Sequence, residues 1–354
     1  MSRFFSDRFS ALKPYTPGEQ PQNRKYVKLN TNESPFPPSR LAREMASKEA
    51  ERLMLYSDPE CRELCRVFSE EYGVAPDEVI FGNGSDELLN FAFMAFCSDA
   101  VPAVYADITY GFYKVYAALN RIPSRVIPLE DDFTIDIDKY ISTRGTVFIA
   151  NPNAPTGIAL PLFEIERLVA SDRNRVVIID EAYVDFGAES AVSLTRKYDN
   201  LMVIGTFSKS RSMAGARLGY AIASPELIAD INRLKYSTNP YNINRMTMAA
   251  GVGAISDRDY FKDNCQRIIE CREWTVAELT ALGFSILPSS ANFIFAKSSR
   301  IDGERLYREL KERGVLVRHF SDERIKEYNR ITIGNSEQMQ ILVDKIKEIL
   351  EETK

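Results

Sequence analysis

A lysine near the middle of the chain, Lys209, stands where an amine could act as a nucleophile. It follows an apolar run over 202–205, lies next to Ser208, and precedes Arg217 by eight residues in a loop rich in Gly and Ala. A lysine partly desolvated at the end of a strand can have a lowered pKa and attack a carbonyl as the neutral amine. Ser208 and Arg217 are suited to hold a phosphate. The alternative is a surface lysine beside a basic loop.

A carboxylate, Asp180, ends the apolar run 176–179, and Tyr183 follows three residues later. Burying a carboxylate at the end of a strand is costly unless a cation or a strong hydrogen-bond donor pairs with it. The segment therefore indicates a partner for Asp180. A structural ion pair is the alternative to a functional one.

A glycine-rich turn with the sequence GNGSDE covers 82–87. It lacks the third glycine of a dinucleotide-binding motif, since Glu87 stands there, which argues against a nicotinamide site. A turn that opens a helix still presents free N–H groups and the positive end of the helix dipole to a phosphate. The alternative is a plain turn in which Ser85 or Asp86 caps the helix that runs to residue 96.

A second turn, NPNAPTG over 151–157, directly follows the apolar run 147–150. The carboxyl edge of the sheet is where ligands bind in α/β proteins. Two prolines fix the backbone of this turn, and Asn153 can aim its side-chain amide at a ligand. A rigid surface turn is the alternative.

These residues require a scaffold in which several strands end at one edge. Short apolar runs alternate with helical patterns, which predicts an α/β fold with a mostly parallel central sheet flanked by helices. The expected strands cover 79–81, 103–105, 126–128, 147–150, 176–179, 202–205 and 219–223. Early helices are expected over 40–55 and 60–72, the second closed by Gly73.

The pattern of expected helices and strands changes after about residue 245. A long helix is expected over 259–282, and the pattern that follows predicts a smaller C-terminal α+β domain. We therefore expect an N-terminal arm over 1–39, a large α/β domain over 40–245 and a small domain over 246–354. The expected elements of the small domain are strands over 284–287, 293–296, 315–318 and 330–333 and helices over 302–313 and 336–352.

Composition excludes several classes of protein. The 354 residues carry a net charge of -5, which gives no indication of a nucleic-acid partner, and no apolar run reaches the length of a membrane span. The single histidine rules out a multi-histidine metal site within one chain, and the five cysteines include no CxxC pair. We expect no metal, no membrane and a cytoplasmic protein with reduced thiols.

The order and spacing of these motifs resemble those of the fold-type I pyridoxal-phosphate aminotransferases, and within them the histidinol-phosphate aminotransferase family. The resemblance runs from about Tyr15 to Gly334. Further segments that carry it are LNTNESPFPPS from residue 29, LYSDPECRELCRVF from 55, ANFIF from 291 and RITIG from 330. The resemblance implies pyridoxal 5'-phosphate as cofactor and a homodimer.

The resemblance also implies a role for each cofactor-binding residue. Lys209 would bond to the cofactor aldehyde and carry protons, and Asp180 would keep the ring nitrogen protonated. Tyr183 and Asn153 would donate to the phenolic oxygen, and Tyr110 would lie against the ring. The phosphate would be held by Gly84, Ser85, Asp86, Ser208 and Arg217, together with Tyr56 of the neighbouring subunit. Many relatives have a second Asn where this chain has Ala154.

Recognition of the substrate anion would fall mainly to arginine, because a guanidinium binds carboxylate or phosphate through two donors. The residues implied for the substrate are Tyr15, Asn32, Arg318 and Arg330. The resemblance implies transamination of L-histidinol phosphate with 2-oxoglutarate, giving imidazole acetol phosphate and L-glutamate, in histidine biosynthesis. The alternatives are an aromatic or broad-range aminotransferase, a threonine-phosphate decarboxylase-like enzyme, and a non-catalytic binding or regulatory module on the same fold.

Overall fold

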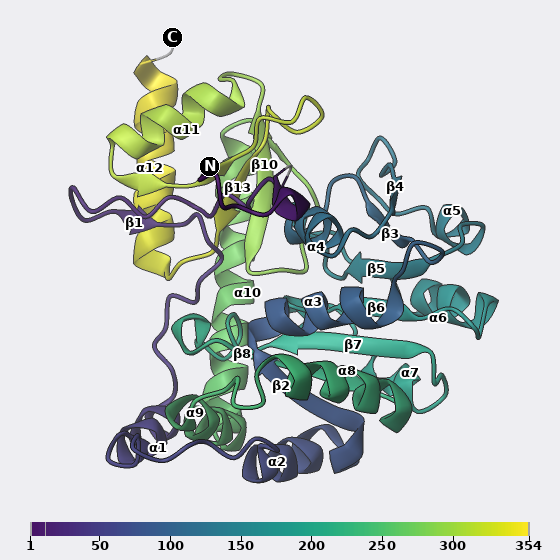
Figure 1. Cartoon of the computed structure of the whole chain (residues 1–354). Helices are drawn as coiled ribbons and strands as arrows, with labels where there is room; N and C mark the ends of the chain where they lie inside the picture. The colour runs from purple at the N-terminus through teal and green to yellow at the C-terminus, as the bar shows by residue number, and fades with distance from the viewer. Residues whose placement is uncertain (1, 11, 353–354) are drawn as a thin grey trace.

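The larger of two main sheets has seven strands in the computed structural model, which describes residues 2–10 and 12–352 (Figure 1). The strand order is β2, β8, β7, β6, β5, β3, β4. Strand β8 runs antiparallel to β7 and β2, and the other neighbouring pairs are parallel. The strands are β2 (Val79–Asn83), β3 (Ala103–Ala106), β4 (Ser124–Ile127), β5 (Thr146–Ala150), β6 (Val177–Asp180), β7 (Leu201–Thr206) and β8 (Leu218–Ala223).

Helices cover both faces of this sheet because alternate side chains of its strands point to opposite faces. Phe148 packs with residues of α3, α4 and α8, whereas Val147 and Ile149 pack with α5, α6 and α7. These helices are α3 (Gly84–Phe96), α4 (Phe112–Asn120), α5 (Ile137–Ile141), α6 (Leu162–Ser171), α7 (Val192–Thr195) and α8 (Pro225–Thr238). The central strands are therefore apolar on both faces, as parallel sheets require.

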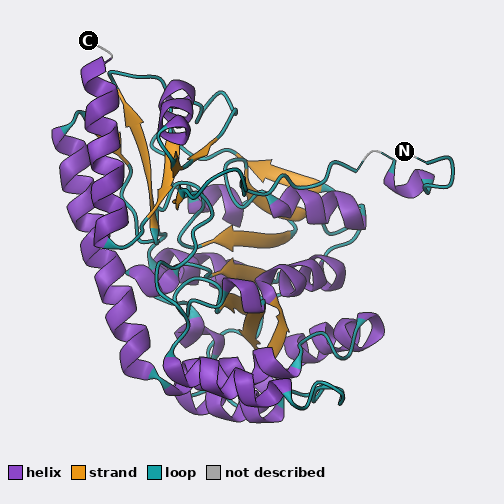
Figure 2. Cartoon of the chain, turned by 90° about the vertical axis from the view of Figure 1, so that its left-hand side faces the viewer, coloured by secondary structure: helices purple, strands orange, loops and turns teal. Residues whose placement is uncertain are grey.

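Three further helices form a core with β2 and β8. They are α1 (Arg40–Ala50), α2 (Arg62–Tyr72) and α9 (Arg245–Ser256). Helix α2 ends at Gly73, which has φ 64°, a left-handed conformation that glycine adopts without strain. The 24-residue helix α10 (Arg258–Ala281) then runs from α9 toward the second sheet (Figure 2).

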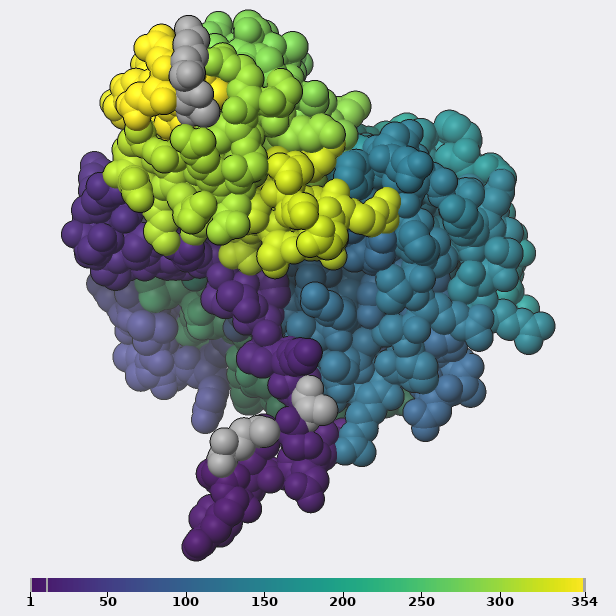
Figure 3. Space-filling view, turned by 90° about the horizontal axis from the view of Figure 1, so that it is seen from above, coloured from purple at the N-terminus to yellow at the C-terminus, as the bar shows by residue number. Residues whose placement is uncertain are grey.

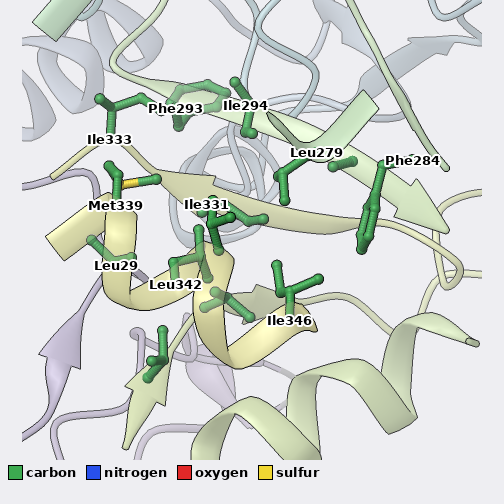
Figure 4. Packing of buried hydrophobic residues seen from close by; sticks show 14 of the residues in the cluster. Leu29, Leu279, Phe284, Phe293, Ile294, Ile331, Ile333, Met339, Leu342 and Ile346 are labelled. Carbon is green, nitrogen blue, oxygen red and sulfur yellow. The ribbon is translucent and has the colours of Figure 1, made fainter. Parts of the chain in front are cut away.

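The second sheet has four antiparallel strands in the order β12, β13, β10, β9. Its apolar side packs on α10 and α12, where Phe293 and Ile331 meet Met339 and Leu342 (Figure 4). The strands and helices of this region are β9 (Phe284–Ile286), β10 (Phe293–Ser298), α11 (Gly303–Glu312), β11 (Val315–Leu316), β12 (Arg318–His319), β13 (Asn329–Thr332) and α12 (Ser336–Glu352).

The N-terminal segment joins the two regions. Strand β1 (Val27–Lys28) pairs in parallel with β11, and Leu29 continues this link through hydrogen bonds to Leu316 and Thr332. Farther toward the N-terminus, the chain projects from the body of the molecule (Figure 3). A short 3₁₀ turn, η1 (Asp7–Phe9), lies in this projecting part, and its residues are not buried.

The α/β fold with a mostly parallel sheet and a C-terminal antiparallel sheet is confirmed, with two local corrections. The first helix ends at Ala50 rather than 55. The expected strand over 315–318 is two strands, because β11 pairs with the arm whereas β12 pairs with β13. Helix α9, which follows residue 245, packs on the large sheet. The division into an arm and two domains at 39 and 245 stays a prediction.

Three short 3₁₀ turns complete the elements of the large region: η2 (Pro76–Glu78), η3 (Val184–Phe186) and η4 (Ala214–Ala216). Within residues 2–10 and 12–352, no helix combines the length and apolar character that a membrane crossing needs.

Candidate active site

The topology brings the predicted site residues to one edge of the large sheet. Asp180 is the last residue of β6, and Lys209 follows the end of β7. Because β8 is antiparallel to β7, Gly219 pairs with Thr206, so Arg217 lies where β7 ends. Strand β2 is again reversed relative to β8 and ends at the same edge, where α3 begins.

A cavity of about 370 Å³ opens at this edge. Such a volume is within the range of roughly 300–1,000 Å³ typical of small-molecule sites. The predicted residues that line it are Ser85, Asp86, Tyr110, Asp180, Tyr183, Ser208, Lys209 and Arg217. The structure thus brings together residues that lie up to 132 positions apart in the sequence.

The amine of Lys209 lies in surroundings that disfavour its charge. Burial lowers the pKa of Lys209 from its ordinary 10.5 to about 8, and the positive charge of Arg330 acts in the same direction. The Nζ atom lies 3.4 Å from the carbonyl oxygen of Thr31 and 5.8 Å from the ring centre of Tyr183. A substantial fraction of this amine is therefore neutral, and nucleophilic, in mildly alkaline solution.

The carboxylate of Asp180 is buried, with one oxygen bound and one without a partner. Tyr113 donates its hydroxyl to Oδ2 at 2.9 Å, and Oδ1 has no hydrogen-bond partner among the described residues. Burial raises the pKa of Asp180 to about 7, although the hydrogen bond from Tyr113 lowers it. Asp180 also lines the cavity, and a buried carboxylate at a cavity wall is well placed to accept from a ligand N–H group.

The turn between β2 and α3 forms a cradle of backbone groups. The N-cap Asn83 makes no side-chain cap, so the expected capping by Ser85 or Asp86 is wrong: both residues lie inside the first turn. The N–H of Gly84 binds a carbonyl, but the N–H groups that follow it in the first turn and the helix dipole favour an anion. A Cβ atom on Gly219 would lie 2.3 Å from the Ser85 nitrogen, so glycine is needed for this close approach.

Arg217 closes this cradle. Its Nη2 atom donates to Asp86 Oδ2 at 2.7 Å, and its carbonyl accepts from the N–H of Gly84 at 2.9 Å. Gly84 does not line the cavity but has φ 75°, and a Cβ there would lie 2.4 Å from the Arg217 guanidinium. Tyr110 also donates its hydroxyl to Asp86, at 2.6 Å, which fixes the tyrosine ring at the cavity wall.

Asn153 and Tyr56 do not line this cavity. Asn153 donates its amide to the carbonyl of Ile108 and to Thr156, and its Oδ1 accepts from Thr109. Its side chain lines a separate cavity of about 460 Å³, whereas the neighbouring Ala154 lines the Lys209 cavity. Tyr56 is 80% exposed and stacks on the Tyr241 ring at 4.6 Å.

The residues expected to bind the substrate flank the cavity without lining it. Arg330 donates to the carbonyl of Asn30 at 3.1 Å, and its Nε is buried without a partner among the described residues. Burial lowers the pKa of Arg330. Arg318 donates to two arm carbonyls at 3.3 Å, those of Thr16 and Pro17.

Tyr15 and Asn32 differ in exposure. Tyr15 is 38% exposed and stacks on Phe112 with ring centres 4.3 Å apart. Asn32 is 1% exposed and binds Tyr183 and Thr332 through its side chain.

Several cavity residues are absent from the sequence-based prediction. They include Gln20, Thr31, Glu33 and Thr206 along the wall, and Tyr113 beneath Asp180. The LNTNESPFPPS segment contains Thr31 and Glu33, so the motif gave a signal for these two. No spacing in the sequence indicates that Tyr113 would reach Asp180.

Comparison with known proteins identifies the family. The model of the aminotransferase class I and II family matches residues 24–346. The chain belongs to this family of aminotransferases. It is 48% identical over 352 residues to a protein of Brachyspira hyodysenteriae named histidinol-phosphate aminotransferase, with 99% of each chain covered. It is 50% identical to one of the same name from Marinomonas sp., with 98% of this chain and 99% of the other covered.

A solved aminotransferase has the same fold. The histidinol-phosphate aminotransferase of Sinorhizobium meliloti, determined in complex with pyridoxal-5'-phosphate, superposes with a TM-score of 0.89 at 22% identity, covering 100% of this chain and 99% of the other. The family membership confirms the predicted enzyme class, an aminotransferase.

Proposed function

We propose that this aminotransferase transfers the amino group of L-histidinol phosphate to 2-oxoglutarate, with pyridoxal phosphate as cofactor, in histidine biosynthesis in the cytoplasm. The observation that carries the proposal is the cavity shared by Lys209 and Asp180, in a chain whose full-length relatives bear the name histidinol-phosphate aminotransferase.

The residues present fit pyridoxal phosphate at both ends of the cavity. Asp180 Oδ1 is buried and has no hydrogen-bond partner among residues 2–10 and 12–352, as expected of an acceptor for a protonated ring nitrogen. The uncapped start of α3, together with Ser208 and Arg217, suits a phosphate group. When bound, the cofactor supplies an aldehyde and a ring that accepts electrons.

Each residue of the chain then has a chemical task. Lys209, whose pKa is lowered to about 8, supplies the neutral amine and afterwards moves a proton at its Nζ atom. Asp180 would keep a proton on the ring nitrogen of the cofactor, and Tyr183 would donate to its phenolic oxygen. Arg330 binds the anionic part of each substrate, because its guanidinium is buried near Lys209 with no carboxylate paired to it among the described residues.

The proposed functional unit is a homodimer. The segment 53–56 exposes three consecutive apolar side chains: Leu53 is 56% exposed, Met54 81% and Leu55 53%. Tyr56 follows them and is 80% exposed, and Tyr241 stacks beside it. An apolar run of this kind favours contact with a second copy, in which Tyr56 would reach the partner's phosphate cradle.

The test compares amine donors on purified protein loaded with pyridoxal phosphate. We expect glutamate to form from L-histidinol phosphate and 2-oxoglutarate, and Lys209→Ala to abolish its formation. L-phenylalanine tests the aromatic alternative, and release of carbon dioxide from O-phospho-L-threonine tests the decarboxylase alternative. Faster turnover with either of these, and no glutamate from histidinol phosphate, would contradict the proposed substrate.

A further inference from the structure

The buried Asn32 links the arm to both sheets through four hydrogen bonds. Its N–H donates to Thr332 Oγ1 at 2.9 Å, and its Oδ1 accepts from the same hydroxyl at 3.0 Å. Its Nδ2 donates to the Tyr183 hydroxyl at 3.0 Å, and its carbonyl accepts from Asn292 at 3.1 Å. Its φ of 55° lies in the left-handed region, so its backbone is also held in a specific conformation.

These bonds determine which way the Asn32 amide faces. Thr332 Oγ1 accepts the backbone N–H of Asn32 and donates its own hydrogen to the side chain of Asn32. Only the oxygen of an amide side chain can accept it, so Oδ1 faces Thr332. Nδ2 therefore faces Tyr183, and an amide nitrogen can donate a hydrogen bond but not accept one.

The direction of the Tyr183 proton follows from this arrangement. The Tyr183 oxygen accepts from Asn32, so its own hydrogen points elsewhere, and Tyr183 lines the cavity. The other residue expected to donate to the phenolic oxygen, Asn153, has its amide bound to Ile108 and Thr156. Ala154, which stands at the cavity wall next to it, has no polar side chain.

We propose that Asn32 is a positioning residue that directs the Tyr183 proton into the cavity, toward the phenolic oxygen of the cofactor. The inference rests on the proposed function, since it concerns the same cofactor site. It also gives Thr332 of β13 a role, because Thr332 fixes the Asn32 amide. A residue of the second sheet thereby determines the direction of the hydrogen bond that Tyr183 donates in the active site.

The expected signature is a change in the pH midpoint of the visible band of the bound cofactor. A hydrogen bond donated to the phenolic oxygen lowers the affinity of that oxygen for the proton that it shares with the Lys209 nitrogen. Losing one hydrogen bond to a charged group therefore raises the midpoint by about one pH unit. The charged groups that act on Tyr183 are Arg330, Asp180 and Asp86, and the Lys209 amine lies over its ring.

Asn32→Asp is the decisive variant, because a carboxylate accepts the Tyr183 proton and turns it away from the cavity. We expect it to raise the midpoint by about the same pH unit as Tyr183→Phe. Asn30→Asp is the matched control: Asn30 is 2% exposed, lies two residues away and donates its amide to the carbonyl of Glu19 rather than to Tyr183. In the Tyr183→Phe background, Asn32→Asp should raise the pH midpoint by no more than Asn30→Asp raises it.

A second pair of variants covers the case in which Asn32→Asp fails to fold. Thr332→Val removes the hydroxyl that orients the amide and should raise the midpoint, whereas Thr332→Ser keeps the hydroxyl and should leave it unchanged. A midpoint that Asn32→Asp moves no further than Asn30→Asp, or equal midpoints for the two Thr332 variants, would overturn the inference. If the unaltered protein binds pyridoxal phosphate without any visible band, the proposed function fails, and this inference with it.

Discussion

We compare the free energy of unfolding of Asp180→Asn with that of the unaltered chain, both without cofactor. The variant should gain stability relative to the unaltered chain as the solution changes from acidic to alkaline. Burial raises the pKa of Asp180 from 3.8 to about 7. Between these values the folded state binds more protons than the unfolded state, so the free energy of unfolding falls as the pH rises. The free-energy cost of ionised Asp180 is absent below its pKa in the unfolded state. It grows with pH up to its pKa in the folded state and stays constant above that value.

The magnitude follows from the size of the pKa shift. At about 1.4 kcal/mol per pH unit, the full cost of ionised Asp180 is about 4 kcal/mol at pH 8 and less than about 2 kcal/mol at pH 5. In Asp180→Asn, the amide hydrogens that face the cavity are unpaired. This lowers the free energy of unfolding by an amount that does not depend on pH. The difference in stability between variant and unaltered protein should therefore grow by about 2 to 3 kcal/mol from pH 5 to pH 8.

Urea unfolding of the cofactor-free protein at the two pH values measures this difference. Glu337→Gln removes an exposed carboxylate at the start of α12 and serves as the control, for which we expect no such change. Tyr113→Phe removes the hydrogen bond to Asp180 and should destabilise the protein more at pH 8 than at pH 5. A stability difference for Asp180→Asn that is the same at both pH values would refute the reasoning.

Three other substitutions test the remaining parts of the site. Lys209→Ala should remove the covalent link between pyridoxal phosphate and the chain, seen as a shift of the cofactor band in absorption spectra, and lower the transamination rate at least about a hundredfold. Arg330→Leu should raise the KM for 2-oxoglutarate about 10- to 100-fold in steady-state kinetics, since charged hydrogen bonds to the substrate carboxylate are lost, while Arg330→Lys should recover part of the loss. Gly219→Ala should lower the free energy of unfolding by about 1 to 3 kcal/mol in urea titrations and weaken retention of the cofactor, because its Cβ would lie 2.3 Å from the Ser85 nitrogen. A Gly219→Ala protein as stable as the unaltered one would show that the turn shifts without cost.

The sequence indicated the site most reliably where backbone position decides the outcome. Asp180, Lys209 and Arg217 lie at strand ends, and the order of the strands alone brings them to one edge. Asn153 shows the limit of this reasoning: the sequence predicts it at the correct edge, but its amide binds the carbonyl of Ile108, which follows β3, and Thr156 of its own loop. Local acceptors compete for such a side chain, and spacing along the chain does not reveal which of them binds it.

Tyr113 and Asn32 show a second limit. Tyr113 lies on a helix face that could equally be core, and only the packing of α4 against the sheet brings its hydroxyl to Asp180. Asn32 is bound by Thr332, which lies 300 residues away. Contacts of this kind depend on how separate elements dock, which no local pattern encodes.

The electrostatics of the cavity explain why these supporting contacts are needed. Burial works against the charged form of two groups that line the cavity and of the nearby Arg330: it lowers the pKa of Lys209 and of Arg330 and raises that of Asp180. A site assembled from such groups opposes folding, so packing elsewhere in the two sheets must hold it together. An aromatic cofactor with a protonated ring nitrogen and an aldehyde suits Asp180 and Lys209, and an anionic substrate suits Arg330. The binding free energy of these ligands adds to the stability of the folded state. The burial that lowers the stability of the cofactor-free protein thus favours binding of the cofactor and the anionic substrate in place of water.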